Sequence, residues 1–166
     1  LAKGKADSAF KKLLKEYQSS DNFSALLGCD SLFEFEGEIF GKPNNKEQLI
    51  LRWQRMSGKS GFLHTGHYLI SMDKLNSDDQ SKSLSKSYAG VKSTKIEFMN
   101  LSNIDINIYA SISEPYNCAG GFAIEGYGGL FIKKIDGCFS NVIGLSLPWL
   151  KTNLEKLGLS ESLVNS

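Results

Sequence analysis

The chain has 166 residues and a nearly balanced charge, with 19 lysine or arginine side chains, 18 aspartate or glutamate side chains and a formal net charge of +1. Its length suits one domain with a substantial core, and the charge balance excludes the strongly basic surface that binds nucleic-acid polymers without regard to sequence. No apolar run is long enough to span a membrane and no charged-then-apolar leader opens the chain, so we expect a soluble, cytoplasmic protein.

Residues 1–18 carry apolar side chains at helical spacing, with lysines between them, which predicts an amphipathic helix. Lys5 lies on this segment, where spacing alone indicates an ordinary surface lysine. The chain starts on Leu1, without a methionine and already within the helical pattern, so we expect a preceding segment to be missing.

The stretch from Gly28 to Pro43 predicts a β-hairpin. Polar and apolar residues alternate along it, and Glu36-Gly37 is a two-residue connection typical of antiparallel strands. The strand ends would then bring Asp30 close to Lys42. A carboxylate at a strand end beside glycine can act as a general base or a metal ligand. The alternative is that Asp30 caps a turn and Lys42 is a solvated loop lysine.

A helix is predicted directly after the hairpin. Asn44 can cap its N-terminus, with Glu47 three residues later in the arrangement of a capping box. Gly58 supplies the stop. Apolar residues recur between them at helical spacing, namely Leu49, Trp53 and Met56, and we assign this helix to core packing without a chemical role.

Two further strands are predicted over residues 62–72 and 88–99, where apolar and polar side chains alternate. Residues 74–86 between them are rich in serine, lysine, aspartate and asparagine. We expect this polar segment to form a surface loop.

The histidines and cysteines do not predict a metal site. His64 and His67 are three residues apart on a strand and therefore point to opposite faces, so they cannot bind one ion together, and hydrogen-bonding or structural roles are favoured. Cys29, Cys118 and Cys138 are odd in number and widely spaced. This pattern favours reduced thiols over a disulfide framework or a structural zinc site.

A second helix is predicted to begin at Ser102, with Asp105 at its third helical position. It should end at Ser113-Glu114-Pro115, because the residue before proline disfavours helical backbone. The segment from Cys118 to Gly144 then holds seven of the 16 glycines, as expected where main-chain amides line a ligand cleft. Structural turns alone explain the glycines equally well.

Residues 129–136 predict a strand in which the apolar run 130–132 is buried. A last helix begins near Ser146, with Pro148 at an early helical position, and stops at Gly158.

The order of these elements predicts an α/β fold in which a twisted mixed β-sheet is flanked by helices. We expect one domain over residues 1–158, incomplete at its N-terminus, followed by a frayed tail over residues 159–166.

Several short motifs run through nearly all of residues 1–158. They are Leu1-Ala2 with Lys5-Ala6, Gly28-Cys29-Asp30-Ser31, Gly37-Glu38-Ile39-Phe40-Gly41-Lys42-Pro43, His64-Thr65-Gly66, Glu114-Pro115, Cys118-Ala119-Gly120, Ile124-Glu125-Gly126 and Ser140-Asn141-Val142-Ile143-Gly144-Leu145. In their order and spacing they resemble the Maf family of nucleoside triphosphate pyrophosphatases. The resemblance implies a two-lobed architecture with a central cleft, like that of inosine triphosphatases. It also implies that a first strand and a phosphate-binding S-x-x-R turn are absent from this chain.

The resemblance implies roles for individual residues. Asp30 would take the proton of the attacking water or hold a divalent metal ion, Mg²⁺ or Mn²⁺. Lys42 and Lys5 would bind phosphate oxygens. Ser31 and Glu125 fall on positions linked to base selection, where most family members carry threonine and glutamine, so the preferred nucleotide stays open.

The function implied is hydrolysis of a nucleoside triphosphate to the monophosphate and pyrophosphate, with dTTP, UTP or modified, house-cleaning substrates as candidates. The resemblance also suggests a homodimer. Two alternatives stay open, namely a non-catalytic nucleotide-binding regulator of cell division and septum formation, and a degenerate fragment without a ligand.

Overall fold

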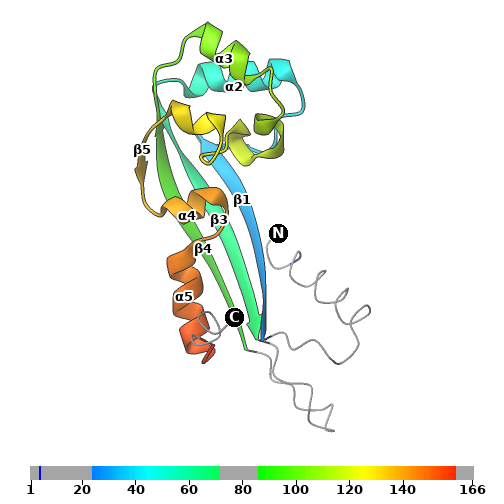
Figure 1. Cartoon of the computed structure of the whole chain (residues 1–166), viewed down its shortest axis with the longest axis vertical. Coiled ribbons are helices and arrows are strands. Elements are labelled where there is room, and N and C mark those ends of the chain that lie inside the picture. The colour runs from blue at the N-terminus through cyan, green and yellow to red at the C-terminus, as the bar shows by residue number, and fades with distance from the viewer. Residues whose placement is uncertain (1–3, 5–23, 72–85, 160–166) are drawn as a thin grey trace. The chain divides into compact units, whose positions relative to one another are not determined.

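The computed structural model describes residues 4, 24–71 and 86–159 of the chain (Figure 1). The predicted helix over residues 1–18, including Lys5, falls outside this description except at residue 4. Nearly all of the predicted surface loop and of the predicted tail also falls outside it. Within the described part of the chain, no helix combines the length and the apolar character that crossing a membrane requires.

The described strands form one sheet in the order β2-β1-β3-β4-β5. The long strands are β1 (Ala25–Phe35), β3 (Ser60–Ser71) and β4 (Ser87–Phe98). The chain divides into two compact units: unit 1 holds residues 1–30, 66–91 and 147–166, and unit 2 holds residues 31–65 and 92–146. Each long strand therefore supplies residues to both units. Helices accompany the sheet in both units, which confirms the predicted α/β class.

The predicted hairpin is confirmed. β1 pairs antiparallel with the short strand β2 (Glu38–Phe40), with Phe33 opposite Phe40. The connecting residues Glu36 and Gly37 have φ angles of 50° and 80°, the positive values that a type I′ turn requires at both central positions. β2 ends at Phe40, so Lys42 lies beyond the strand pairing, in the bend that follows.

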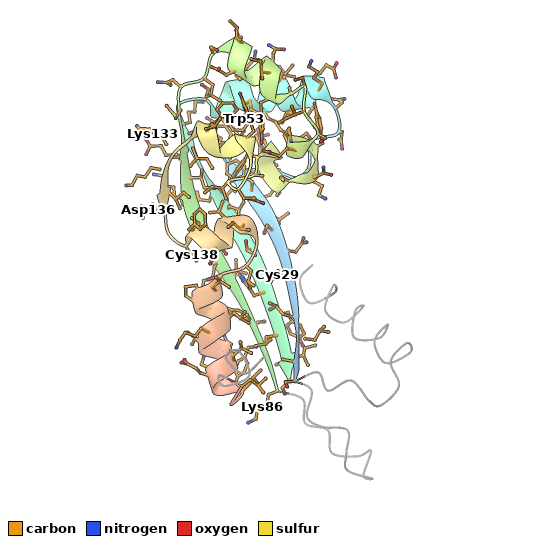
Figure 2. All side chains as sticks on the ribbon, viewed as in Figure 1. Cys29, Trp53, Lys86, Lys133, Asp136 and Cys138 are labelled. Atoms are coloured by element: carbon orange, nitrogen blue, oxygen red, sulfur yellow. The ribbon has the colours of Figure 1, made fainter. Side chains whose placement is uncertain are left out.

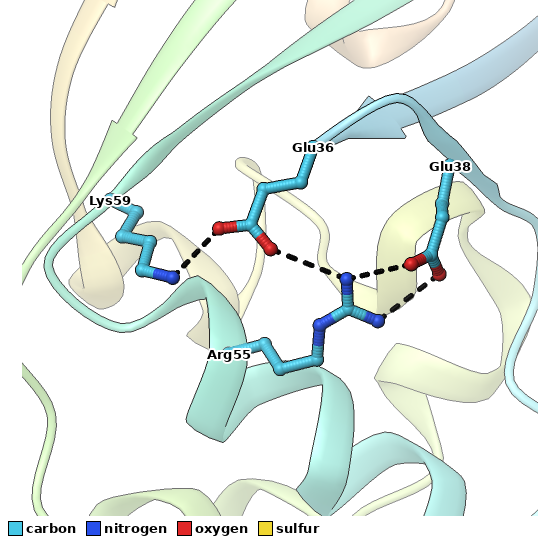
Figure 3. Close-up of polar contacts among 4 residues, drawn as sticks. All are labelled: Glu36, Glu38, Arg55 and Lys59. Atoms are coloured by element: carbon cyan, nitrogen blue, oxygen red, sulfur yellow. Dashed lines mark hydrogen bonds and ion pairs between the residues drawn. The ribbon is translucent and has the colours of Figure 1, made fainter.

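Four exposed charged side chains connect this turn to α2 (Lys46–Met56) and the residues after it (Figure 3). Arg55 donates to both carboxylate oxygens of Glu38, at 3.1 and 2.9 Å, and to Glu36 at 3.3 Å, while Lys59 donates to Glu36 at 2.7 Å. The hydrogen bond from Lys59, followed by that from Arg55, lowers the pKa of Glu36. Because exposed pairs contribute little individually, the network orients the turn rather than stabilising the fold strongly.

The N-terminus of α2 corrects the predicted cap by one residue. Asn45, and not Asn44, is the N-cap, and its side chain accepts the backbone N–H of Gln48 at 2.9 Å. The Gln48 side chain in turn accepts the backbone N–H of Asn44 at 2.8 Å. Two adjacent asparagines satisfy the same sequence rule, and the helix geometry selects the one whose side chain reaches an unpaired N–H. The predicted stop at Gly58 is confirmed by its φ of 71°.

Helix α3 (Asn103–Tyr109) begins as predicted and ends earlier. Ser102 and Asp105 form a reciprocal capping box. The helix stops at Tyr109, and the chain then enters the short 3₁₀ helix η1 (Glu114–Asn117), in whose first turn Pro115 lies. The predicted end at residues 113–115 is therefore wrong, because proline here begins a new helical turn, where its missing N–H costs nothing.

The predicted strand over residues 129–136 is shortened to β5 (Ile132–Asp136), which pairs antiparallel with β4. Residues Tyr127–Phe131 form the 3₁₀ helix η3 instead. The apolar run was expected to be buried throughout, yet Leu130 is 65% exposed and Phe131 is 6% exposed. Consecutive residues of a 3₁₀ turn point in different directions, so this run cannot be buried together.

Unit 2 contains an aromatic core around Trp53 of α2 (Figure 2), which is fully buried. Its ring meets Phe98, Tyr109 and Phe131 edge to face, with ring centroids 5.2, 5.6 and 5.5 Å apart. Phe122 joins this core beside Phe98 at 5.3 Å. Edge-to-face aromatic pairs are favourable beyond the area that they bury, so this core anchors the loops that reach it.

Unit 1 has a smaller core beneath α5 (Leu147–Lys156), in which Trp149 and Leu154 pack with Leu69. The Trp149 ring stacks on His67 with centroids 4.8 Å apart. The predicted last helix is confirmed. The five-residue helix α4 (Phe139–Ile143) of unit 2 was not predicted from the sequence.

Candidate functional site

The segment that carries Lys42 follows β2 and is held in place from both sides. Arg52 of α2 donates to the carbonyl of Gly41 at 2.8 Å. Pro43 is buried and lies so close to Gly121 that a Cβ atom at position 121 would come within 3.1 Å of its ring. Lys42 between them is exposed, so its ammonium group stays available in a fixed segment.

The glycine-rich segment packs against this same bend. This is the segment that was predicted to come close to a ligand. Gly120 and Gly121 form the 3₁₀ helix η2 with Ala119 and have φ angles of 74° and 76°. Trp53 donates its indole N–H to the carbonyl of Gly121 at 3.1 Å. A Cβ atom at Gly121 would also lie 2.7 Å from Leu49. These glycines therefore serve backbone packing, which supports the structural interpretation of the glycine density at these positions.

Cys118 lies two residues before Gly120. The pKa of its thiol depends on charged groups from three segments of unit 2. Its pKa is raised by burial, then by the carboxylates of Glu125 and Glu114, and is lowered by the ammonium of Lys42. Lys42 and Glu125 were both predicted as site residues, and the charges of both act on the pKa of this half-buried thiol, in opposite directions. We call Lys42, Glu114, Cys118 and Glu125 the Cys118 cluster.

Glu114 accepts hydrogen bonds with both oxygens of its carboxylate. Oε1 accepts the hydroxyl of Tyr109 and the N–H of Gly128, each at 2.9 Å, and Oε2 accepts the N–H of Tyr127 at 2.8 Å. Burial opposes ionisation of Glu114, but the hydrogen bonds from Gly128, Tyr127 and Tyr109 outweigh it and leave its pKa lowered. Glu114 therefore remains a carboxylate at neutral pH.

Neither Glu114 nor Cys118 was predicted as a site residue, because each appeared only as part of a motif. The density of glycines was a signal that some group approaches the backbone near residue 126. The sequence contains no signal that this group is the carboxylate of Glu114, since the two positions are brought together only by folding.

Ser31 lies in a second polar group of unit 2. Its hydroxyl shares a hydrogen bond of 2.9 Å with Thr65 of β3, and Thr65 donates to the carbonyl of Asn141 in α4 at 3.0 Å. The buried amide of Asn141 donates to Thr94 and to the carbonyl of Lys92, each at 3.1 Å. Ser31, Thr65 and Asn141 come from three of the motifs that carry the resemblance, and hydrogen bonds connect them in this group. None of these contacts involves a residue of the Cys118 cluster.

Asp30 lies in β1, half-buried, and belongs to unit 1 as its last residue in that strand. Lys5, the remaining predicted site residue, lies outside the described residues. Of the predicted site residues, Lys42 and Glu125 both act electrostatically on Cys118, whereas Ser31 lies in the polar group with Thr65 and Asp30 lies in the unit 1 part of β1. The catalytic and binding roles of these residues stay predictions.

The two histidines have contacts of the predicted hydrogen-bonding and structural kinds. His64 contacts Ser93 through Nδ1 at 2.7 Å and Glu34 through Nε2 at 3.0 Å, whereas His67 is buried. The three cysteines, of which Cys29 and Cys138 are marked in Figure 2, take part in no disulfide. Among the described residues, no group of three or more histidine, cysteine, aspartate or glutamate side chains could hold a metal ion by itself.

Comparison with known proteins agrees with the motifs. The family model described as Maf-like protein matches residues 1–157. A nucleoside triphosphate pyrophosphatase of Prochlorococcus marinus strain NATL1A is 75% identical over 99% of this chain and 78% of its own length. Proteins of the same name are 50% identical in Prochlorococcus marinus strain SARG, over 96% of this chain and 77% of the relative, and 43% identical in Trichodesmium erythraeum, over 98% and 74%. The chain belongs to the Maf family.

Proposed function

We propose that the protein is a nucleoside triphosphate pyrophosphatase that cleaves its substrate between the α and β phosphates and releases a monophosphate and pyrophosphate. The observation that carries this proposal is the 75% identity, over 99% of the chain, to a relative that bears this name. The Cys118 cluster supports it, because the charges of an exposed lysine and of carboxylates from distant segments act on the same thiol there.

Asp30 is the proposed catalytic residue. A half-buried carboxylate on a strand can accept the proton of an attacking water while remaining accessible to it. Gly28, two residues earlier in the same strand, presents no side chain to a ligand. Asp30 would thus activate the water that attacks the α phosphate.

A divalent metal ion, Mg²⁺ or Mn²⁺, is proposed as the cofactor, and holding this ion is the alternative role proposed for Asp30. Asp30 offers one carboxylate on β1, and Mg²⁺ commonly binds through one or two carboxylates and completes its shell with phosphate oxygens and water. When bound, such an ion neutralises phosphate charge and lowers the pKa of a bound water.

Lys42 and Lys5 are proposed to bind phosphate oxygens as point charges. The exposure of Lys42 on a segment fixed by Arg52 and Pro43 supports this role. Ser31 and Glu125 are proposed to take part in base selection. A carboxylate at position 125 accepts hydrogen bonds and cannot donate them, so it favours a base that presents an N–H group.

We extend the proposal to a homodimer in the cytoplasm. Light scattering coupled to size-exclusion chromatography tests the dimer, since a monomer and a dimer of an 18.3 kDa chain differ twofold in mass.

The test of the proposed function is pyrophosphate release from a panel of canonical and modified nucleoside triphosphates with Mg²⁺ or Mn²⁺. Asp30→Asn should lower kcat by about 10²- to 10⁴-fold, the usual contribution of a general base. The matched control is Asp136→Asn, which changes an exposed carboxylate of β5 and should leave the rate unchanged. Near-normal turnover by Asp30→Asn would remove Asp30 from the mechanism.

The same panel separates hydrolysis from binding. Saturable nucleotide binding without pyrophosphate release, from wild-type protein in either metal, would overturn the enzymatic proposal in favour of a nucleotide-binding regulator of cell division.

A further inference from the structure

Glu114 is bound to the backbone on which Glu125 lies. Its carboxylate accepts the N–H groups of Tyr127 and Gly128 at 2.8 and 2.9 Å. A carboxylate that accepts two backbone N–H groups and a hydroxyl forms charge-assisted bonds, which are about twice as strong as neutral ones. The backbone after Glu125 is therefore held by a side chain from η1, a segment that precedes it in the chain.

Two glycines make room for this contact. A side chain at Gly126 would collide with the carboxylate of Glu114, and one at Gly128 would lie 2.5 Å from the hydroxyl of Tyr109. The Tyr109 ring also stacks on Tyr127, with centroids 6.0 Å apart and planes inclined by 19°. The loop thus fits closely around the pair of Glu114 and Tyr109.

Glu125 lies inside a turn that this contact anchors. The N–H of Gly126 bonds to the carbonyl of Ala123 at 3.4 Å, and that of Gly129 bonds to the carbonyl of Gly126 at 3.1 Å. Glu125 is exposed, and its carboxylate acts electrostatically on the thiol of Cys118, which Lys42 also reaches. Glu114 holds the turn through two backbone N–H groups, and the turn fixes the backbone position of Glu125.

We infer that Glu114 is a positioning residue, which fixes the turn of residues 123–128 and thereby holds Glu125 in the place where it selects among nucleoside triphosphates. Only the role of Glu125 in nucleotide selection rests on the proposed function. The positioning itself is a property of the folded chain and can be measured without a substrate.

The first experiment measures positioning through the thiol. The rate of Cys118 alkylation by iodoacetamide is followed against pH by mass spectrometry of the Cys118 peptide, in wild type, Glu114→Gln, Glu125→Gln and the double variant. Glutamine keeps the size of the side chain, removes its charge and replaces one acceptor oxygen by an NH₂ donor that faces a backbone N–H donor, so it weakens the contact. Glu125→Gln should lower the Cys118 pKa in the wild-type background and lower it less in the Glu114→Gln background. Equal effects of Glu125→Gln in both backgrounds would overturn the inference.

The second experiment measures selection. The ratio of kcat/KM between the best and second-best triphosphate should fall about tenfold or more in Glu125→Gln, because a hydrogen bond to a charged group contributes about that factor or more. Glu114→Gln should reduce the same ratio. When Glu114→Gln is added to Glu125→Gln, the ratio of kcat/KM values should change less than about twofold. A purely structural role would instead lower kcat/KM equally for all substrates.

Two further variants complete the design. Tyr109→Phe removes one hydrogen bond to Glu114 while the carboxylate stays, and should change alkylation and selectivity in the same direction as Glu114→Gln but less. If Glu114→Gln fails to fold, Tyr109→Phe tests the positioning role of Glu114 in its place. Wild-type alkylation and selectivity in Tyr109→Phe would then overturn the inference. Glu155→Gln, a change on the exposed face of α5, is the control and should match wild type. If wild-type protein releases no pyrophosphate, the proposed function fails while the alkylation cycle still decides the positioning.

Discussion

Trp53 donates its indole N–H to the carbonyl of Gly121 at 3.1 Å and so joins the aromatic core of unit 2 to the glycine-rich segment beside Lys42. The contact is buried at both ends. It explains how a loop with so little side-chain bulk keeps one conformation. The following predictions test this bond and the contacts around it.

Replacing Trp53 should reveal the two contributions separately. Trp53→Phe leaves the Gly121 carbonyl buried without its donor and should lower the free energy of unfolding by about 1–3 kcal/mol. Trp53→Ala adds a cavity in the core and should lower it by about 3–5 kcal/mol. Urea unfolding measures both, and Leu51→Ala, on the exposed side of the same helix at 62% exposure, should stay within about 0.5 kcal/mol of wild type. A stable Trp53→Phe variant would contradict the importance of the bond.

Three glycines allow backbone strain and collision to be measured apart. Gly121→Ala should cause both backbone strain and a collision, because φ is 76° and Leu49 and Pro43 occupy the space that the new Cβ atom needs. Gly158→Ala meets only the positive φ of 71°, with no atom within 4 Å, and should cost about 1–2 kcal/mol. Gly41→Ala meets neither and should be nearly neutral.

The loss in Gly121→Ala should therefore exceed that in Gly158→Ala, as measured by urea unfolding. Equal losses in the two variants would show that the packing around Gly121 adjusts without cost.

Lys42→Ala should change both the thiol and the substrate. Lys42 lowers the pKa of Cys118, so its removal should raise that pKa and slow alkylation at a given pH below it. Loss of a phosphate contact should also lower kcat/KM, by about tenfold or more for a hydrogen bond to a charged group. Lys46→Ala, an exposed lysine of α2, is the matched control. An unchanged alkylation profile in Lys42→Ala would place the ammonium too far from Cys118 to matter.

Glu114 should make the stability of the protein depend on pH in a defined direction. Its hydrogen bonds lower its folded-state pKa below the ordinary value of 4.5. Its contribution to stability is therefore fully present above pH 4.5 and is lost as the pH falls through the folded-state value. Thermal unfolding at a series of pH values should show a steeper loss below pH 4.5 in wild type than in Glu114→Gln. Parallel curves would show that the carboxylate does not hold the loop.

The parts of the fold predicted correctly are those set by a few neighbouring residues. The hairpin turn follows from Glu36-Gly37, and the start of α3 follows from Ser102 with Asp105 three residues later. The cap of α2 was placed one residue early because Asn44 and Asn45 obey the same local rule. Only the position of the first unpaired N–H distinguishes them.

The candidate site could be predicted in its members but not in its arrangement. Lys42 and Glu125 were named from motifs, and only the folded structure shows that both act electrostatically on Cys118. Ser31 came from the same motifs and lies with Thr65 and Asn141 instead. Motif membership indicates that residues matter together, and it contains no information on which of them are neighbours.

The sequence by itself determined the turn of the hairpin, the start of α3 and the course of α5, because alternation, capping and turn conformation depend on residues within one or two turns of each other. Tertiary structure decided the end of α3, the exposure of Leu130 and the contact between Glu114 and the Tyr127–Gly128 backbone. These features depend on which distant segment packs against a residue. A half-buried carboxylate such as Glu114 accepts hydrogen bonds wherever the folded chain presents unpaired N–H groups, and no local rule specifies that place.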